Sequence, residues 1–212
     1  DSTFININED SNQFAAVSLR NPRQLTDSLY HFTGILPVST TTATINYNIQ
    51  LRDRAMNSGQ RTDRVTYAYI TPGDSSSFLS TSGLAHFKID KSGVDEPTAF
   101  FITEEKINTI TERNISSIYH LTPSINFSPK DVVLNNQGEI SFDINEYLSP
   151  DIYDWQYVIM EMNDNGYEQL TTYFSDGKVS AHIYTLSSFA VYVNLDITKP
   201  IPTTFKLQQN YP

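Results

Sequence analysis

Apolar and polar residues alternate along much of the chain. The clearest case is residues 44–51, where every second residue is apolar and the residues between are Thr, Asn or Gln. Successive side chains of a strand point to opposite faces, so this pattern predicts a strand with one buried and one wet face. Residues 139–144, 178–183 and 189–195 repeat the alternation. We therefore expect antiparallel strands that cover a common core.

Turn sequences separate several of the predicted strands. Residues 163–166 read Asn-Asp-Asn-Gly and residues 175–177 read Ser-Asp-Gly, and both are typical of tight hairpins because these residue types tolerate positive φ. Residues 72–74 (Pro-Gly-Asp) and 135–138 (Asn-Asn-Gln-Gly) predict two further breaks between strands.

Many short strands separated by turns favour an all-β fold, specifically an antiparallel β-sandwich, which we expect to consist of two packed modules. Pro, Gly, Ser and Thr gather at residues 71–83, where we place a boundary. The expected organisation is an N-terminal β-rich module over residues 1–75 and a sandwich module over residues 82–195. Residues 196–212 would form a Pro-punctuated linker and a further strand.

The composition narrows the class of protein. The 212 residues include 13 tyrosines and 12 phenylalanines, which suit a pleated, half-buried surface. With 24 acidic against 14 basic residues, the net charge is −10, which argues against binding to nucleic acid. The absence of cysteine excludes disulfides and thiolate sites. There is no apolar run of about 18 residues, so we expect no membrane insertion.

The second half of the chain resembles a known module. Residues 117–130 read Ser-Ile-Tyr-His-Leu-Thr-Pro-Ser-Ile-Asn-Phe-Ser-Pro-Lys, and Val-Val-Leu follows at 132–134. A strand-like string at 157–162, a tight turn and Ser-Phe-Ala-Val at 188–191 come next in order. This succession resembles the β-sandwich of the ankyrin and netrin-receptor type. The resemblance implies a spacer or binding module of a larger secreted protein.

The last twelve residues, Ile-Pro-Thr-Thr-Phe-Lys-Leu-Gln-Gln-Asn-Tyr-Pro at 201–212, carry a second resemblance. They resemble the opening of the C-terminal sorting domain found on cargo of the type IX secretion system of Bacteroidetes. The resemblance implies an extracellular or outer cell-surface location, and it implies nothing about activity.

Exposed aromatic rings beside amides and carboxylates would suit carbohydrate, because rings stack on the apolar face of a pyranose. The only tryptophan lies in such a cluster at residues 151–157, and two tyrosines share one strand face nearer the N-terminus. The candidate glycan-binding residues are Trp155, Tyr153, Tyr157, Asp151, Asp154, Tyr67 and Tyr69. The alternative is structural: Trp155 closes the end of the sandwich and the tyrosines cover the core.

Paired carboxylates would suggest a glycoside hydrolase. The candidate pairs are Glu104 with Glu105, Asp95 with Glu96, and Asp151 with Asp154. Adjacent residues of a strand point to opposite faces, however, so such a pair cannot address one substrate. Solvated charges explain these residues more simply.

Metal sites have three candidate locations. His86 and His120 could bind a metal if their strands paired in register. Calcium could bind Asp164, Asn165 and Glu168 of the predicted hairpin, or Asp151 and Asp154, although neither set has the spacing of a known calcium loop. We therefore expect no cofactor, with calcium as the alternative.

Taken together, these observations predict a non-catalytic extracellular module that acts as a spacer, an adhesion region or an accessory binding region. Its partner would be an extracellular glycan or a neighbouring module of the parent protein. A dedicated carbohydrate-binding module and a small hydrolase with paired carboxylates are the alternatives.

Overall fold

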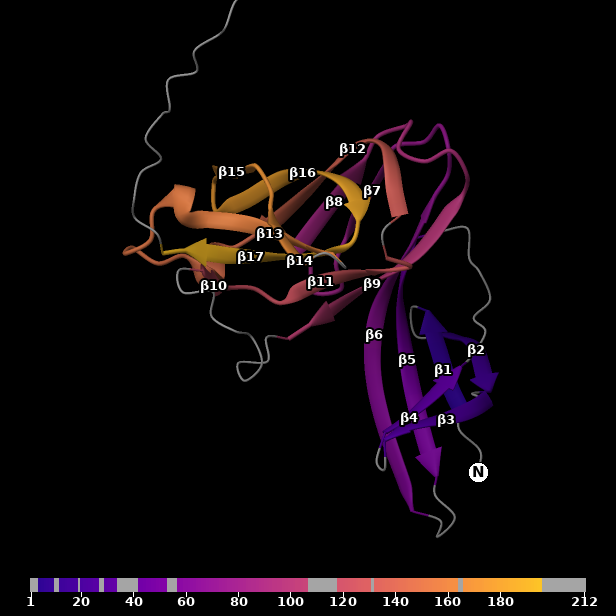
Figure 1. The fold of residues 1–212 in the computed structure, drawn as a ribbon. Coiled ribbons are helices and arrows are strands. Elements are labelled where there is room, and N and C mark those ends of the chain that lie inside the picture. Colours follow the sequence, from indigo (N-terminus) through magenta and orange to yellow (C-terminus); the bar gives the residue numbers. More distant parts are fainter. Residues whose placement is uncertain are drawn as a thin grey trace, which may run out of the picture.

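The computed structural model describes residues 4–9, 12–18, 20–26, 29–33, 42–52, 57–106, 118–130, 132–163 and 166–195. Within these ranges the chain is built of antiparallel strands and two short 3-10 turns (Figure 1). The predicted all-β class and the sandwich architecture are confirmed. The predicted linker and final strand at 196–212 lie outside the described residues.

One layer of the sandwich is the large sheet, with strand order β14-β13-β17-β11-β9-β6-β5-β1-β2 and with β10 paired to β17. Its strands are β1 (Phe4–Glu9), β2 (Asn12–Ser18), β5 (Ala43–Arg52), β6 (Ser58–Ile70), β9 (Thr98–Glu105), β10 (Ile118–His120), β11 (Ser124–Ser128), β13 (Tyr157–Asn163), β14 (Gly166–Gln169) and β17 (Ser188–Asn194). A separate hairpin joins β3 (Arg20–Thr26) and β4 (Leu29–Thr33).

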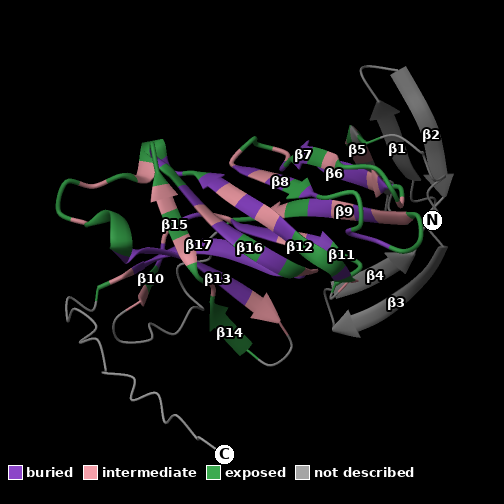
Figure 2. Cartoon of the chain, turned by 90° about the horizontal axis from the view of Figure 1, so that it is seen from above, coloured by how far each residue is buried: buried purple, intermediate pink, exposed green. Residues whose placement is uncertain are grey.

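The second layer is the five-stranded sheet, with order β15-β16-β12-β8-β7. Its strands are β7 (Ser76–Leu79), β8 (Ala85–Ile89), β12 (Val132–Asp143), β15 (Thr172–Ser175) and β16 (Lys178–Leu186). The turns η1 (Asn145–Tyr147) and η2 (Asp154–Gln156) connect β12 to β13. Figure 2 shows buried and exposed positions alternating along β8, β12 and β16.

The core lies between the two sheets and is rich in phenylalanine. Phe78 and Phe87 of the five-stranded sheet meet Phe100, Phe127 and Phe189 of the large sheet. The rings of Phe87 and Phe127 pack edge to face across the interface, with centroids 4.7 Å apart. Such contacts add to the hydrophobic free energy of burial and join the sheets into one unit.

Strand β6 links the N-terminal strands to the sandwich. Its first half pairs with β5 and runs away from the sandwich in Figure 1, while residues 66–70 pair with β9. Ala68 and Ile70 belong to the core cluster. The core therefore draws on residues within the predicted 1–75 module, and the described backbone continues from β6 into β7.

The turn predictions have mixed outcomes. The hairpin at 175–177 is confirmed, with positive φ at Asp176 and Gly177, and β13 pairs with β14 across the predicted turn at 163–166. The predicted break at 135–138 is wrong. Strand β12 continues through these residues, and a register shift between Val133 and Gly138 accommodates the polar stretch as an irregularity in the ladder.

Candidate functional site

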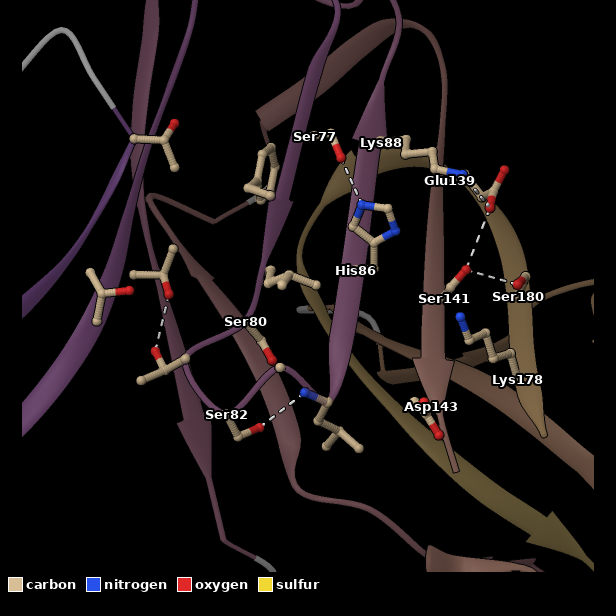
Figure 3. A pocket seen from close by; sticks show the side chains of 18 of the residues that line it. Ser77, Ser80, Ser82, His86, Lys88, Glu139, Ser141, Asp143, Lys178 and Ser180 are labelled. Atoms are coloured by element: carbon tan, nitrogen blue, oxygen red, sulfur yellow. Dashed lines mark hydrogen bonds and ion pairs between the residues drawn. The ribbon is translucent and has the colours of Figure 1, made fainter. Parts of the chain in front are cut away.

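The outer face of the five-stranded sheet carries a polar groove. Strand alternation sends Phe87, Ile140 and Ala181 into the core, so the residues next to them in the sequence face outward. These outward residues are short or charged, and they line an open groove of about 1000 Å³ that extends from β7 to β16 (Figure 3). The labelled lining residues are Ser77, Ser80, Ser82, His86, Lys88, Glu139, Ser141, Asp143, Lys178 and Ser180.

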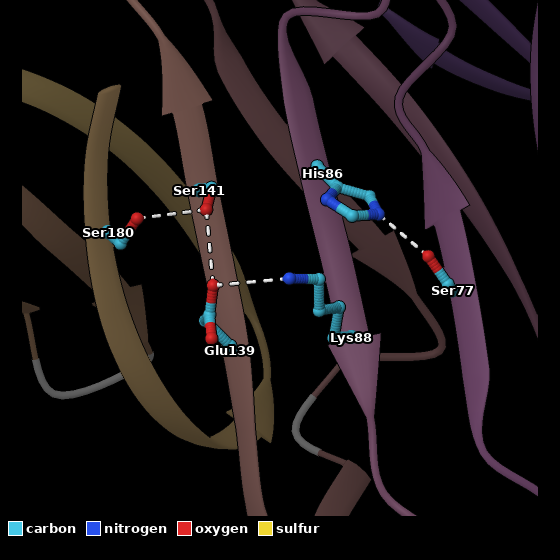
Figure 4. A network of polar contacts seen from close by, with 6 residues as sticks. All are labelled: Ser77, His86, Lys88, Glu139, Ser141 and Ser180. Carbon is cyan, nitrogen blue, oxygen red and sulfur yellow. Dashed lines mark hydrogen bonds and ion pairs between the residues drawn. The ribbon is translucent and has the colours of Figure 1, made fainter. Parts of the chain in front are cut away.

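A chain of polar contacts crosses the floor of the groove (Figure 4). Lys88 Nζ lies 3.9 Å from Glu139 Oε1, and the same carboxylate oxygen accepts a hydrogen bond of 3.4 Å from Ser141 Oγ. Ser141 Oγ in turn lies 2.9 Å from Ser180 Oγ. These residues come from three adjacent strands whose registers pair Glu139 with Lys88 and Ser141 with Ser180. The strand ladders thus place these donors and acceptors on one face of the sheet.

A second contact joins Ser77 and His86 at the β7 side of the groove. Ser77 Oγ lies 2.7 Å from Nε2 of His86. Burial, and then the nearby Lys88 ammonium, lower the pKa of His86 below its ordinary value of 6.5. The pair has the nucleophile and base of a hydrolase triad, in which a carboxylate orients the base. Here the network carboxylate, Glu139, instead contacts Lys88 and Ser141.

One wall of the groove is the turn between β7 and β8. Ser80 Oγ accepts a hydrogen bond of 3.1 Å from the backbone of Ala85, and Ser82 Oγ accepts one of 3.1 Å from Leu84. The carboxylate of Glu104 accepts a hydrogen bond of 2.6 Å from the backbone N–H of Ser82. This contact ties the turn to the large sheet and gives Glu104, a candidate hydrolase residue, a structural partner.

Exposed rings lie beyond the β16 side of the groove on the same sheet. Tyr173 of β15 is 57% exposed and Tyr184 of β16 is 60% exposed. The ring of His182 packs edge to face on Tyr173 at 6.1 Å. Because Ser180, His182 and Tyr184 alternate along β16, all three point to the outer face. Hydrogen-bonding groups and ring faces therefore share one surface.

The turn at 151–157 presents a second, smaller aromatic surface. Tyr153 and Trp155 are 66% and 47% exposed, and their rings stack with an interplanar angle of 8° and centroids 6.1 Å apart. Asp151 and Asp154 are exposed beside them. The structure therefore brings four of the predicted glycan-binding residues together at one end of the sandwich.

The other three predicted residues do not join that surface. Tyr157 is 2% exposed, and its Oη accepts a hydrogen bond of 3.1 Å from the backbone of Ser149. Tyr67 is 4% exposed and packs on Phe101, while Tyr69 on the same strand is half-buried. The two buried tyrosines present no ring face to solvent because β-sheet packing covers them, which is the structural alternative stated above.

The remaining sequence candidates are dispersed. Asp95 and Glu96 lie exposed in the loop after β8. His86 and His120 lie in different sheets, so they do not pair in register. Glu168 is exposed on β14, whereas Asp164 and Asn165 lie outside the described residues. Within the described ranges no three His, Asp or Glu side chains gather as a metal site.

A comparison with known protein families gives no match, and a comparison with curated proteins finds none similar to this chain. In the part of the chain that the structure describes, no helix has the length and apolar character needed to cross a membrane.

The groove could have been found only in part from the sequence. The alternation at 139–144 and 178–183 identified Glu139, Ser141 and Ser180 as wet-face residues. The alternation does not give the strand order: β8 and β12 are about fifty residues apart in the sequence, yet they pair in the sheet. The signal for the groove in the sequence was that serine recurs at the solvent-facing positions of several predicted strands.

Proposed function

We propose that this protein is a non-catalytic extracellular module that binds glycan through the outer face of its five-stranded sheet. The observation that carries the proposal is the groove of about 1000 Å³ lined by serine and threonine hydroxyls and by charged side chains of both signs. Binding would let the module act in adhesion, or hold a neighbouring module of the same protein close to its substrate.

The charges of the groove favour a polyhydroxylated ligand over a highly charged one. Lys88 and Lys178 face Glu139, Asp143 and Asp176, so neither sign prevails along the lining. A sugar hydroxyl both donates and accepts hydrogen bonds, and such a surface offers both kinds of partner. Ser141 and Ser180 are short and hydrogen-bonded to each other, so they would lose little side-chain conformational entropy on binding.

The rings of Tyr173 and Tyr184 support the same ligand class. An exposed tyrosine offers an apolar face and a polar tip, a combination that suits the alternating apolar and polar surfaces of a pyranose. Both rings lie on the sheet that carries the groove, so one oligosaccharide could contact hydroxyls and rings together.

The extracellular setting is part of the proposal. It is supported by the resemblance of residues 201–212 to the sorting domain of type IX secretion cargo, and by the resemblance of residues 82–195 to a module of secreted proteins. Both point to a surface-attached or secreted parent protein of Bacteroidetes in which this chain is an accessory region.

Affinity gel electrophoresis in soluble β-glucan, xylan and mannan tests the proposal. We expect at least one polysaccharide to retard the protein. The double substitution Lys88→Ala/Glu139→Ala removes two exposed groups of the groove floor and should lower the affinity at least about ten-fold, since each hydrogen bond to a charged group contributes about 1.5–3 kcal/mol. Lys91→Ala/Glu96→Ala, two exposed charges in the loop after β8, is the matched control.

A second candidate site has its own observation in its favour, the exposed stacked pair Tyr153 and Trp155. If retardation is lost in Trp155→Ala and kept in Lys88→Ala/Glu139→Ala, glycan binding belongs to that turn. If none of the polysaccharides retards the wild-type protein, the glycan proposal is wrong and a spacer role is left.

A further inference from the structure

Strand β13 buries a carboxylate on the core side of the large sheet. Tyr157 and Ile159 of this strand belong to the core cluster, and Glu161 continues their alternation. The Glu161 residue is only 8% exposed. Burial of a charged group is costly unless hydrogen bonds or an opposite charge compensate it. The cost of burying Glu161 must therefore be offset by the groups that surround it.

Hydrogen bonds from two hydroxyl groups compensate the burial of one oxygen of the Glu161 carboxylate. Ser187 Oγ donates to Glu161 Oε1 at 2.6 Å, and Thr185 Oγ1 donates to the same oxygen. Among the described residues, no donor contacts Oε2, and no lysine or arginine forms an ion pair with this carboxylate. The carboxylate is thus held firmly by one oxygen while the other has no protein partner within the described ranges.

Glu161 lines a cavity of about 590 Å³ at the open edge between the sheets. The pairing of β15 with β16 extends only as far as Thr172 and Ala181, so the second half of β16 borders the cavity. Glu168 pairs directly with Glu161 across β13 and β14 and lines the same cavity. Like charges directly opposite each other on a sheet are destabilising, and a cation between them would remove the repulsion.

The rest of the lining selects the kind of cation. Tyr173 and His182, whose rings pack edge to face on the outer side of β15 and β16, lie at the mouth of the cavity, and a tyrosine face attracts ammonium and guanidinium groups. A metal ion would require more oxygen or nitrogen ligands than Glu161 and Glu168 provide, and the described residues hold no group of three such side chains here. A carboxylate with a free oxygen inside a cavity whose mouth carries an aromatic ring suits an organic cation on an extended stem.

We propose that this cavity binds an organic ammonium group, with Glu161 as its counter-ion. The ammonium would donate to the free oxygen of Glu161, Glu168 would add a second negative charge, and the stem of the ligand would pass the Tyr173 ring at the mouth of the cavity. The linings of this cavity and of the groove share no residue, and dependence on the ammonium charge and on Glu161 distinguishes binding here from glycan binding at the exposed tyrosine rings. The ammonium could come from an amino sugar or from a lysine side chain, and the experiment separates the two.

The test is an NMR titration at low salt that follows the ring resonances of His182, which lines the cavity. The probes are D-glucosamine and Nα-acetyl-L-lysine methylamide. We expect at least one probe to give saturable shifts, and which one binds identifies the source of the ammonium. N-acetyl-D-glucosamine, which lacks the charge, should bind at least about ten-fold more weakly, because the charge-assisted hydrogen bond is lost.

The key variant is Glu161→Gln, whose amide oxygen still accepts hydrogen bonds from Ser187 and Thr185. It should weaken binding at least about ten-fold, whereas the same substitution at the exposed Glu146 should leave binding unchanged. If Glu161→Gln fails to fold, as circular dichroism would show, Glu168→Gln replaces it and should weaken binding several-fold, because it removes the charge of the second carboxylate that lines the cavity.

The proposal is overturned if neither ammonium probe shifts His182, or if the variants bind as tightly as the wild-type protein. Equal affinity for N-acetyl-D-glucosamine would also overturn it. Displacement of the bound probe by calcium chloride in a competition experiment would overturn it as well, because the cavity would then be a metal site.

Discussion

Ser77 Oγ and His86 Nε2 lie 2.7 Å apart across the β7–β8 ladder, at one side of the polar groove. The contact joins an exposed hydroxyl to an imidazole that is partly covered by its neighbours. Burial and the Lys88 ammonium both lower the pKa of His86, so the neutral ring is the form that the fold favours. Protonation of His86 at low pH would therefore add a positive charge to the groove.

The first prediction concerns stability in mild acid. Because the pKa of His86 is lower in the folded than in the unfolded chain, the unfolded state takes up a proton first as the pH falls. The stability contributed by the neutral ring is fully present above the ordinary pKa of 6.5 and is lost below it, as the pH falls toward the folded pKa. Urea denaturation in a pH series should show this loss.

His86→Gln is the matched variant, since glutamine keeps a hydrogen-bonding group and does not titrate. As the pH falls below about 6.5, the free energy of unfolding should decrease more for the wild type than for the variant. A difference that is the same at all pH values would contradict the prediction, and one that moves the opposite way would show that His86 is stabilised in its charged form.

Period-two alternation predicted the strands because each sheet of this fold has one face in the core. Phe87, Ile140 and Ala181 alternate with wet residues, and this local pattern is visible without a structure. The hairpin at Gly177 was equally predictable, since turn chemistry is local. Neither signal contains the order of strands in a sheet, so the groove, which strands of both sheets line, could not be placed.

The errors arose where a long-range contact overrides local chemistry. Asn135 and Gln137 look like loop residues, yet β12 continues past them with an irregular register against β16. Tyr67, a candidate for stacking on a sugar, is buried. Glu161 drew no attention because a strand glutamate is usually solvated, and its burial depends on Thr185 and Ser187, more than twenty residues away.

The second prediction concerns Tyr157, which was expected at a ligand site and instead lies in the core. Its Oη accepts a hydrogen bond from the backbone of Ser149 and so fastens the η1–η2 connection to the sandwich. Tyr157→Phe should lower the free energy of unfolding by about 1 kcal/mol, because the N–H of Ser149 loses its partner while the packing of the ring is kept. Thermal unfolding checks this, with Tyr119→Phe as the exposed control.

The third prediction concerns the phenylalanine core. Phe87 is fully buried and contacts both Phe78 and Phe127, so its ring joins the two sheets. Phe87→Ala should destabilise the protein by about 3–5 kcal/mol, since it loses the transfer free energy and leaves a cavity. Trp155→Ala at the exposed turn should change the stability much less. Equal losses for the two variants, measured by chemical denaturation, would mean that the sheets do not share this core.

The last prediction separates two costs of replacing a turn glycine. Gly177 has φ of 72°, and a Cβ added there would clash with Oδ1 of Asn145. Gly73 has a similar φ of 87°, but a Cβ there would meet nothing within 4 Å. Gly73→Ala should therefore cost only the backbone strain of about 1–2 kcal/mol, and Gly177→Ala should cost clearly more because Asn145 must move. If thermal unfolding gives equal losses for the two variants, the side chain of Asn145 moves away freely and the β15–β16 turn does not constrain η1.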